Sequence, residues 1–175
     1  MKDYGKWIKR LSSILRYDPE SGKLYWTKSQ GRAAAGDEAG SVVGNYREIC
    51  FQGSKAMMHR VIWYMHYDEI LPSGVFLDHI NRIPLDNRIS NLRKSTCGQN
   101  IMNRPGLSGA ASKYKGVRYM KAGLKHWHSE FKKDGKCTFL GVFQTEEEAA
   151  LAYDKAVSAA WGEFAYQNFP SEALR

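Results

Sequence analysis

The sequence predicts an α+β protein made of two small domains, and three observations carry this prediction. Up to about residue 104, short apolar runs with strand character alternate with amphipathic stretches. Residues 113–170 hold three strand-like runs followed by one helix. Residues 105–112 between them are rich in Pro, Gly and Ser and have no hydrophobic periodicity. We therefore expect a first domain over 1–104, a linker over 105–112, and a second domain over 113–170 in which a three-stranded antiparallel sheet packs on the helix.

The first domain begins with a stretch of helical periodicity. Apolar residues recur at helical spacing over residues 4–16, which predicts an amphipathic helix. Turn-forming residues at 17–23 lead into a short strand at 24–26. The Gly- and Ala-rich stretch 31–44 predicts a loop in which residues 41–43 can form a short strand. The pattern then predicts a strand at 46–51, a tight turn at 53–54 and a helix at 57–66.

A polar stretch follows the apolar run 75–77, which we expect to be a strand. This strand delivers Asp78 and His79 to an exposed turn, so that a carboxylate and an imidazole stand side by side. From Ser95 the sequence favours a helix, and a hairpin followed by that helix would return Asn100 to a position beside Asp78. The stretch therefore predicts oxygen ligands next to one histidine.

These residue types match the needs of a hard divalent cation. Mg²⁺ takes one or two protein oxygens and leaves its other positions to water and phosphate, and Asp78 and Asn100 offer such oxygens. The imidazole of His79 titrates near neutral pH, so it can take a proton from an attacking water. Asn91 lies between them in the chain. Its amide both donates and accepts, which suits bracing of the loop that carries His79.

The second domain combines three strand-like runs with one helix. The runs lie at 117–119, 126–132 and 138–141, and an Asp-Gly hairpin turn separates the last two. Thr145 begins a capping box, and the small side chains of the helix that follows allow it to pack closely on the sheet until Gly162.

Charge, cysteine spacing and hydropathy indicate what kind of molecule the protein binds and in which compartment it acts. The formal charge of +8 and the pI of about 9.4 favour a polyanionic partner. Cys50, Cys97 and Cys137 are widely spaced and form no Cys-x-x-Cys pair, so neither a disulfide framework nor a zinc ribbon is expected. No apolar run has the length of a membrane span, and the first residues lack the pattern of a signal peptide. We therefore expect a cytoplasmic protein.

The polar stretch resembles the ββα-metal core of HNH nucleases, especially the phage HNH homing endonucleases. The resemblance rests on Asp78-His79, on Asn91-Leu92 and on Asn100. It implies that Asp78 and Asn100 bind the metal, that His79 is the general base, and that Asn91 is the structural asparagine of the motif. Because Asn100 stands where many of these enzymes have histidine, the oxygen ligands favour Mg²⁺ or Mn²⁺ over Zn²⁺.

Other residues near this motif have expected roles as well. Arg82, Arg88 and Arg93 lie in the same basic stretch, and we expect them to contact DNA. His59 occurs at the matching place in many HNH chains, and we expect a structural role for it rather than a second catalytic one. Contact between DNA and residues 27–45 is left open.

Residues 113–170 resemble the AP2 DNA-binding domain. The matching motifs are Lys115-Gly116-Val117-Arg118, Trp127, Glu130-Phe131, Leu140-Gly141-Val142-Phe143, Glu147-Glu148-Ala149-Ala150, Ala152-Tyr153-Asp154 and Asn168-Phe169-Pro170. The resemblance implies that the sheet enters the major groove with several cations on one face. The residues expected near bases or phosphates are Lys115, Arg118, His126, Glu130 and Lys132. The usual arginine is absent from Cys137-Thr138-Phe139, so no sequence preference is carried over.

Together the two resemblances imply a metal-dependent endonuclease that hydrolyses phosphodiester bonds in double-stranded DNA, with homing behaviour implied by the family. One site per chain makes a monomeric, site-specific nickase the simplest expectation, acting in the host cytoplasm if a phage encodes it. The alternative is a non-catalytic, sequence-specific DNA-binding regulator on a decayed nuclease fold. A third possibility is an RNA-binding or protein-interaction module.

Overall fold

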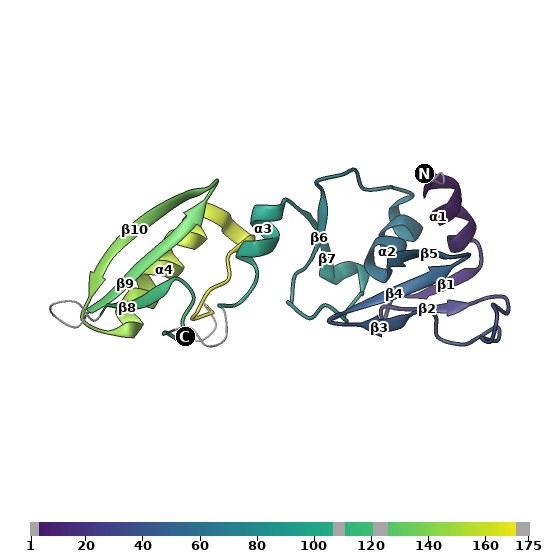
Figure 1. The fold of residues 1–175 in the computed structure, drawn as a ribbon, viewed down its shortest axis with the longest axis horizontal. Coiled ribbons are helices and arrows are strands. Elements are labelled where there is room, and N and C mark those ends of the chain that lie inside the picture. Colours follow the sequence, from purple (N-terminus) through teal and green to yellow (C-terminus); the bar gives the residue numbers. More distant parts are fainter. Residues whose placement is uncertain (1–3, 107–110, 121–125, 171–175) are drawn as a thin grey trace. The chain divides into compact units, whose positions relative to one another are not determined.

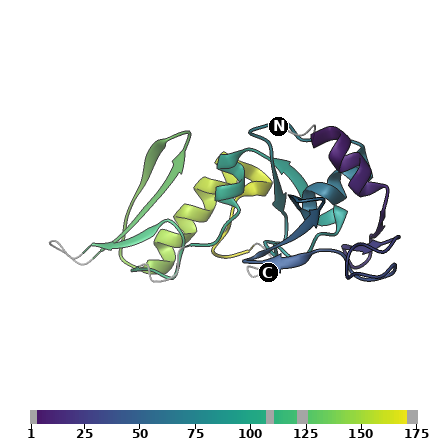
Figure 2. The ribbon, with the colours of Figure 1, turned by 45° about the vertical axis from the view of Figure 1, so that its right-hand side comes forward.

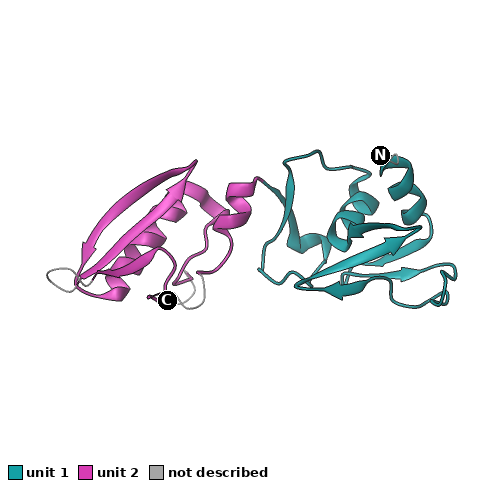
Figure 3. Ribbon diagram, viewed as in Figure 1, with its two compact units in different colours: residues 1–95 teal, residues 96–175 magenta. Residues whose placement is uncertain are grey.

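The computed structural model describes residues 4–106, 111–120 and 126–170, so the expected linker lies partly outside the described residues. The chain divides into two compact units, residues 1–95 and 96–175 (Figure 1, Figure 3). Helices and antiparallel sheets occur together in the chain, which confirms the predicted α+β class. The division falls before the expected linker, so the helix predicted from Ser95 belongs to the second unit.

The first unit surrounds an apolar core to which α1, α2 and the small sheets all contribute. Leu11, Ile49 and Ile62 are among its fully buried side chains. The elements of this unit are α1 (Tyr4–Ser12), β1 (Leu15–Asp18), β2 (Lys23–Trp26), β3 (Ser41–Val43), β4 (Tyr46–Phe51), β5 (Ser54–Met57), α2 (Met58–Tyr67), β6 (Phe76–His79), the 3-10 turn η1 (Ile89–Asn91) and β7 (Leu92–Ser95). The strands pair as β1-β2, β3-β4-β5 and β6-β7, all antiparallel.

The helix predicted over 4–16 is too long. It ends at Ser12, and Leu15–Asp18 instead pair with β2 as a hairpin. Near this end, Ser12 Oγ donates to the Lys9 carbonyl at 2.9 Å, and Ser13 makes the same kind of bond one residue later. Hydroxyl groups that bond to nearby backbone compete with helix continuation.

β5 replaces the turn and helix start predicted at residues 53–57. It pairs with β4 across a turn in which Gln52 and Gly53 both have positive φ. Ala56 is the buried side chain of this strand. A four-residue strand with one small buried residue gives too weak an alternation to be recognised in the sequence.

The second unit has the predicted three-stranded sheet followed by one helix (Figure 2). The sheet is antiparallel in the order β10-β9-β8, and α4 covers one of its faces. Thr145 and Glu148 form the predicted capping box at the start of α4. The elements are α3 (Cys97–Met102), β8 (Val117–Met120), β9 (His126–Lys133), β10 (Lys136–Phe143), α4 (Glu146–Trp161) and the 3-10 turn η2 (Gly162–Phe164).

Two further findings concern the whole of the described chain. Cys50, Cys97 and Cys137 are exposed free thiols. Within residues 4–106, 111–120 and 126–170, no helix combines the length and the apolar character needed to cross a membrane.

Candidate active site and sheet face

The hairpin of β6 and β7 holds Asp78 and His79 in the first unit. They are the last two residues of β6 and pair with Arg93 and Leu92 of β7. Asp78 exposes 4% and His79 6% of its surface, so the prediction that they lie in an exposed turn is wrong. The strand can bury both side chains because each finds polar partners within the unit.

Asp78 forms an ion pair with Arg93. Arg93 Nε donates to Asp78 Oδ2 at 2.9 Å, and Arg93 Nη2 lies 2.9 Å from the same oxygen. A buried carboxylate is strongly destabilising unless a cation compensates it. Arg93, for which we predicted a contact with DNA, is the countercharge of Asp78 in this structure.

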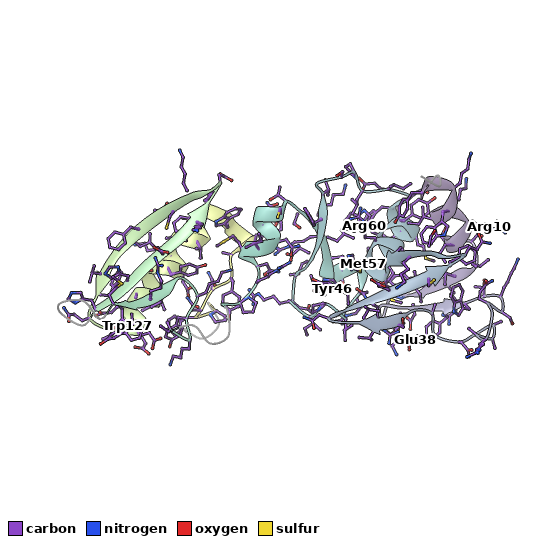
Figure 4. The ribbon with its side chains drawn as sticks, viewed as in Figure 1. Arg10, Glu38, Tyr46, Met57, Arg60 and Trp127 are labelled. Carbon is purple, nitrogen blue, oxygen red and sulfur yellow. The ribbon has the colours of Figure 1, made fainter. Side chains whose placement is uncertain are left out.

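Three side chains from different elements surround His79. Its Nε2 lies 3.1 Å from Oδ1 of Asn87, which is fully buried. Its ring centroid lies 5.4 Å from that of His59, edge to face, and 6.2 Å from that of Tyr46 on β4, which is labelled in Figure 4. Burial lowers the pKa of His79, so the imidazole is neutral at neutral pH. A neutral imidazole is the form that can accept a proton.

His59 lies on the first turn of α2 and exposes 9% of its surface. Its ring centroid is 5.8 Å from that of Tyr46, so the two imidazoles and the phenol form one aromatic cluster. Burial lowers the pKa of His59 to about 3. His59 is therefore a neutral neighbour of His79, a proximity that no sequence pattern indicated.

The side chain of Asn91 closes the loop between β6 and β7. Its Oδ1 accepts from the backbone N–H of Asn81 at 2.9 Å, and its Nδ2 donates to Asn81 Oδ1 at 2.9 Å and to the Asp86 carbonyl at 2.8 Å. Asn91 is also buried. The amide thus makes the kind of bracing contacts expected for the loop that follows His79.

The hairpin of β1 and β2 packs against this loop. Tyr17 Oη accepts from the backbone N–H of Ile89 at 2.8 Å. Gly22, at φ +70°, lies against the backbone of Asn87 and Arg88, and a Cβ there would come within 2.5 Å of the Arg88 nitrogen. Only glycine fits this close approach.

Arg82 and Arg88 lie on the exposed side of the same loop. Arg82 is exposed and has a left-handed φ of +64°. Arg88 Nε and Nη2 donate to the two carboxylate oxygens of Asp86 at 2.8 and 2.5 Å. These bonds lower the pKa of Asp86 to about 2. Both arginines remain on the surface, where a phosphate could reach them.

Asn100 lies on α3, in the second unit, and is partly exposed. The first unit therefore brings Asp78, His79 and Asn91 together, and the second unit carries Asn100. Among the described residues, no three His, Cys, Asp or Glu side chains gather as a metal-binding cluster.

The sheet of the second unit has one face covered by α4 and one open face. Val117 and Ser129 are buried on the covered face, as part of an apolar side that includes Trp127, labelled in Figure 4. The open sheet face consists of the residues that alternate with them, namely Arg118, Met120, His126, His128, Glu130, Lys132, Cys137, Phe139 and Val142. This alternation is the two-residue repeat expected of a β-strand.

The open sheet face is less basic than expected. Within the described strands, Arg118 and Lys132 are its Lys or Arg side chains, and Arg118 Nη2 lies 2.5 Å from Glu130 Oε2. Apolar groups share the face, among them Phe139, which is 58% exposed and packs edge-on with His128. Such a surface can combine charged contacts with apolar contacts to thymine methyl groups.

Lys115 lies just before β8, outside the open sheet face. Its Nζ donates to the backbone carbonyls of Ile101, Met102 and Arg104 at 3.2, 2.8 and 2.6 Å. These carbonyls lie at and just beyond the C-terminal end of α3. A contact of Lys115 with DNA stays a prediction. In this structure its ammonium group stabilises the end of α3.

Part of the chain matches the family model of HNH endonucleases, over residues 56–102. The chain is also 32% identical, over 120 residues and 69% of its length, to an uncharacterized HNH endonuclease of Acanthamoeba polyphaga mimivirus. It spans 61% of the length of that relative. The segment matched by the family model contains Asp78, His79, Asn91 and Asn100.

The C-terminal part is similar to two plant proteins. It is 43% identical over 67 residues to dehydration-responsive element-binding protein 2E of Oryza sativa subsp. japonica, covering 37% of this chain and 20% of the relative. It is 42% identical over 77 residues to dehydration-responsive element-binding protein 2D of Arabidopsis thaliana, covering 43% of this chain and 36% of the relative. No solved structure matches the chain.

Proposed function

We propose that this chain, which joins an HNH endonuclease core to an AP2-like domain, is a metal-dependent endonuclease that nicks double-stranded DNA. The observation that carries the proposal is the buried His79, held by Asn87 and standing beside the paired Asp78, inside the segment that matches HNH endonucleases. A decayed nuclease would not need a histidine held beside the buried side chains of Asn87 and His59.

The surroundings of His79 suit a general base. In the tautomer in which Nε2 donates to Asn87 Oδ1, the lone pair of the ring lies on Nδ1. In the proposed reaction Nδ1 takes the proton of the water that attacks phosphorus. His59 and Tyr46 limit rotation of the ring, and Asn91 keeps the following loop in place.

Asp78 and Asn100 are the proposed ligands of a divalent ion, Mg²⁺ or Mn²⁺. The donor set fits, because the ion pair with Arg93 requires the ionised form of Asp78, which is the form that a metal ion binds. The amide of Asn100 adds a second oxygen. When bound, the ion supplies stabilisation for the negative charge on the leaving 3′ oxygen.

The AP2-like domain is proposed to supply most of the DNA affinity. Its open sheet face would present Arg118, His126, Glu130 and Lys132 to the major groove. Site-specific homing and a monomeric state are proposed from the resemblance and from the single site per chain. The place of action would be the cytoplasm, which is that of the host cell if a phage encodes the chain.

A plasmid assay tests the proposal. Purified protein is incubated with supercoiled DNA in Mg²⁺, in Mn²⁺ and in EDTA, and the products are separated on a gel. Relaxed circles that need the metal support a nickase, and linear DNA indicates a double-strand cutter. DNA binding without any product would support the non-catalytic regulator. Binding to RNA alone, or to no nucleic acid, would support the third possibility.

A further inference from the structure

Helix α3 carries Asn100 but is built into the second unit. Met102, at its C-terminal end, lies in the buried apolar cluster of Tyr153, Val157 and Ala165. The helix has only six residues, and helices of that length are not stable by themselves in water. Its position therefore depends on the side chains of the unit around it.

Contacts near both ends fix the direction of α3. Near its start, Gly98 packs on the ring of Trp161, and a Cβ on Gly98 would lie 3.0 Å from that ring. At its end, the backbone N–H of Tyr166 donates to the Met102 carbonyl at 3.1 Å. The end of α4 and the segment that follows it therefore both contact α3.

Lys115 makes further contacts with the end of this helix. Three carbonyls at and just beyond the end of α3 accept from its ammonium group, which has three N–H donors. A cation at this position also compensates the negative end of the helix dipole. The backbone of Lys115 is fixed in turn, since it bonds in both directions to the side chain of Asn168, which donates to Asp154 of α4.

We propose that Lys115 is a positioning residue of the nuclease, because its ammonium group holds α3 and thereby fixes the orientation of Asn100 within the second unit. The proposal rests on the proposed function, which assigns Asn100 to the metal. Because Lys115 follows the expected linker and α3 precedes it, this role of Lys115 means that the proposed catalytic and DNA-binding parts do not separate at that linker. A chain cut after residue 104 would keep Asn100 and lose Lys115, Trp161 and Tyr166.

The test uses the full chain with Lys115→Met, which removes the charge and keeps an unbranched side chain. The Mg²⁺ concentration needed for half-maximal nicking should rise by roughly tenfold, since hydrogen bonds from a charged donor commonly contribute at least that factor. In EDTA, amide hydrogen exchange over residues 97–102 should become about tenfold faster. Lys113→Met, which removes the same charge two residues earlier, should change neither measurement. Lys115→Arg should restore part of both.

A double variant tests whether the effect passes through Asn100. In an Asn100→Ala background, Lys115→Met should add little to the loss of nicking, because the two residues act on the same step. The inference is overturned if Lys115→Met leaves amide exchange and metal requirement unchanged while it weakens DNA binding in EDTA and lowers the salt slope by about one unit. If the wild type never nicks DNA, the proposed function fails. Unchanged amide exchange over residues 97–102 in Lys115→Met overturns the positioning role of Lys115, whether or not the wild type nicks DNA.

Discussion

The β6-β7 hairpin and the open sheet face both carry polar residues, but they differ in burial. In the hairpin, Asp78, His79 and Asn91 are buried, and each has polar partners within hydrogen-bond distance. On the open sheet face, Lys132 is exposed and Arg118 keeps most of its side chain in solvent despite its pairing with Glu130.

This difference follows from what each surface is proposed to do. Proton transfer needs a base held in one orientation, and buried hydrogen-bond partners provide that orientation. Contact with phosphates depends mainly on charge and counterion release, so long, mobile side chains are sufficient. Substitutions in the hairpin should therefore change rates strongly, whereas substitutions on the open sheet face should change affinity by smaller factors.

The largest effect is expected for His79→Ala. Loss of the general base should slow single-turnover nicking by roughly 10² to 10⁴, while DNA affinity in EDTA stays nearly unchanged. His66→Ala is the control, because His66 is an exposed histidine on α2 in the same unit. Nicking at the wild-type rate by the His79 variant would remove this residue from the mechanism.

Asn87→Ala should have the next largest effect. It removes the partner of His79 Nε2 and leaves a buried nitrogen unpaired, which commonly costs about 1–3 kcal/mol. We expect nicking to slow by roughly 10- to 100-fold and the free energy of unfolding to fall by a similar energy. The nicking rate is measured with the plasmid assay, and the free energy of unfolding is measured by urea denaturation. Asn45→Ala, at an exposed turn, should leave both near wild type; equal effects of the two substitutions would mean that the partner of His79 is unimportant.

A smaller effect is expected on the open sheet face. Replacing Arg118 and Lys132 together by Ala should flatten the logarithmic dependence of DNA affinity on salt by up to about two units if both touch phosphates. If either reads a base edge, the loss should depend on the DNA sequence instead. The control pair is Lys136→Ala with Lys155→Ala, which removes equal charge outside that face. An unchanged slope and affinity would move DNA binding to other surfaces.

The smallest effect concerns pH. Arg88 lowers the pKa of Asp86 from 3.8 to about 2, so the ionised carboxylate stabilises the first unit above pH 3.8. That contribution should be lost as the pH falls from about 4 to about 2. Urea unfolding of wild type and Asp86→Asn should therefore differ by a constant free energy above about pH 5 and converge in strong acid. A difference that does not vary with pH would show that the Arg88 pair adds no stability.

The sequence by itself determined the features that depend on near neighbours in the chain. The capping box of Thr145 and Glu148 involves residues three apart, and the faces of β9 follow from the two-residue repeat of a strand. The pairing of a carboxylate with an imidazole at Asp78 and His79 is visible in the chain as written. Local chemistry of this kind survives in any fold that keeps the segment extended or helical.

Only the tertiary structure decided which side chains surround His79 and which unit holds α3. Asn87, His59 and Tyr46 come from a loop, a helix and a strand, and no periodicity links their positions to that of His79. Likewise, the sequence assigns α3 to the motif before it, whereas the apolar cluster around Met102 and the ammonium group of Lys115 build it into the unit after it. The physical reason is that a six-residue helix goes wherever its side chains find burial and its end carbonyls find donors, and the chain order does not reveal those partners.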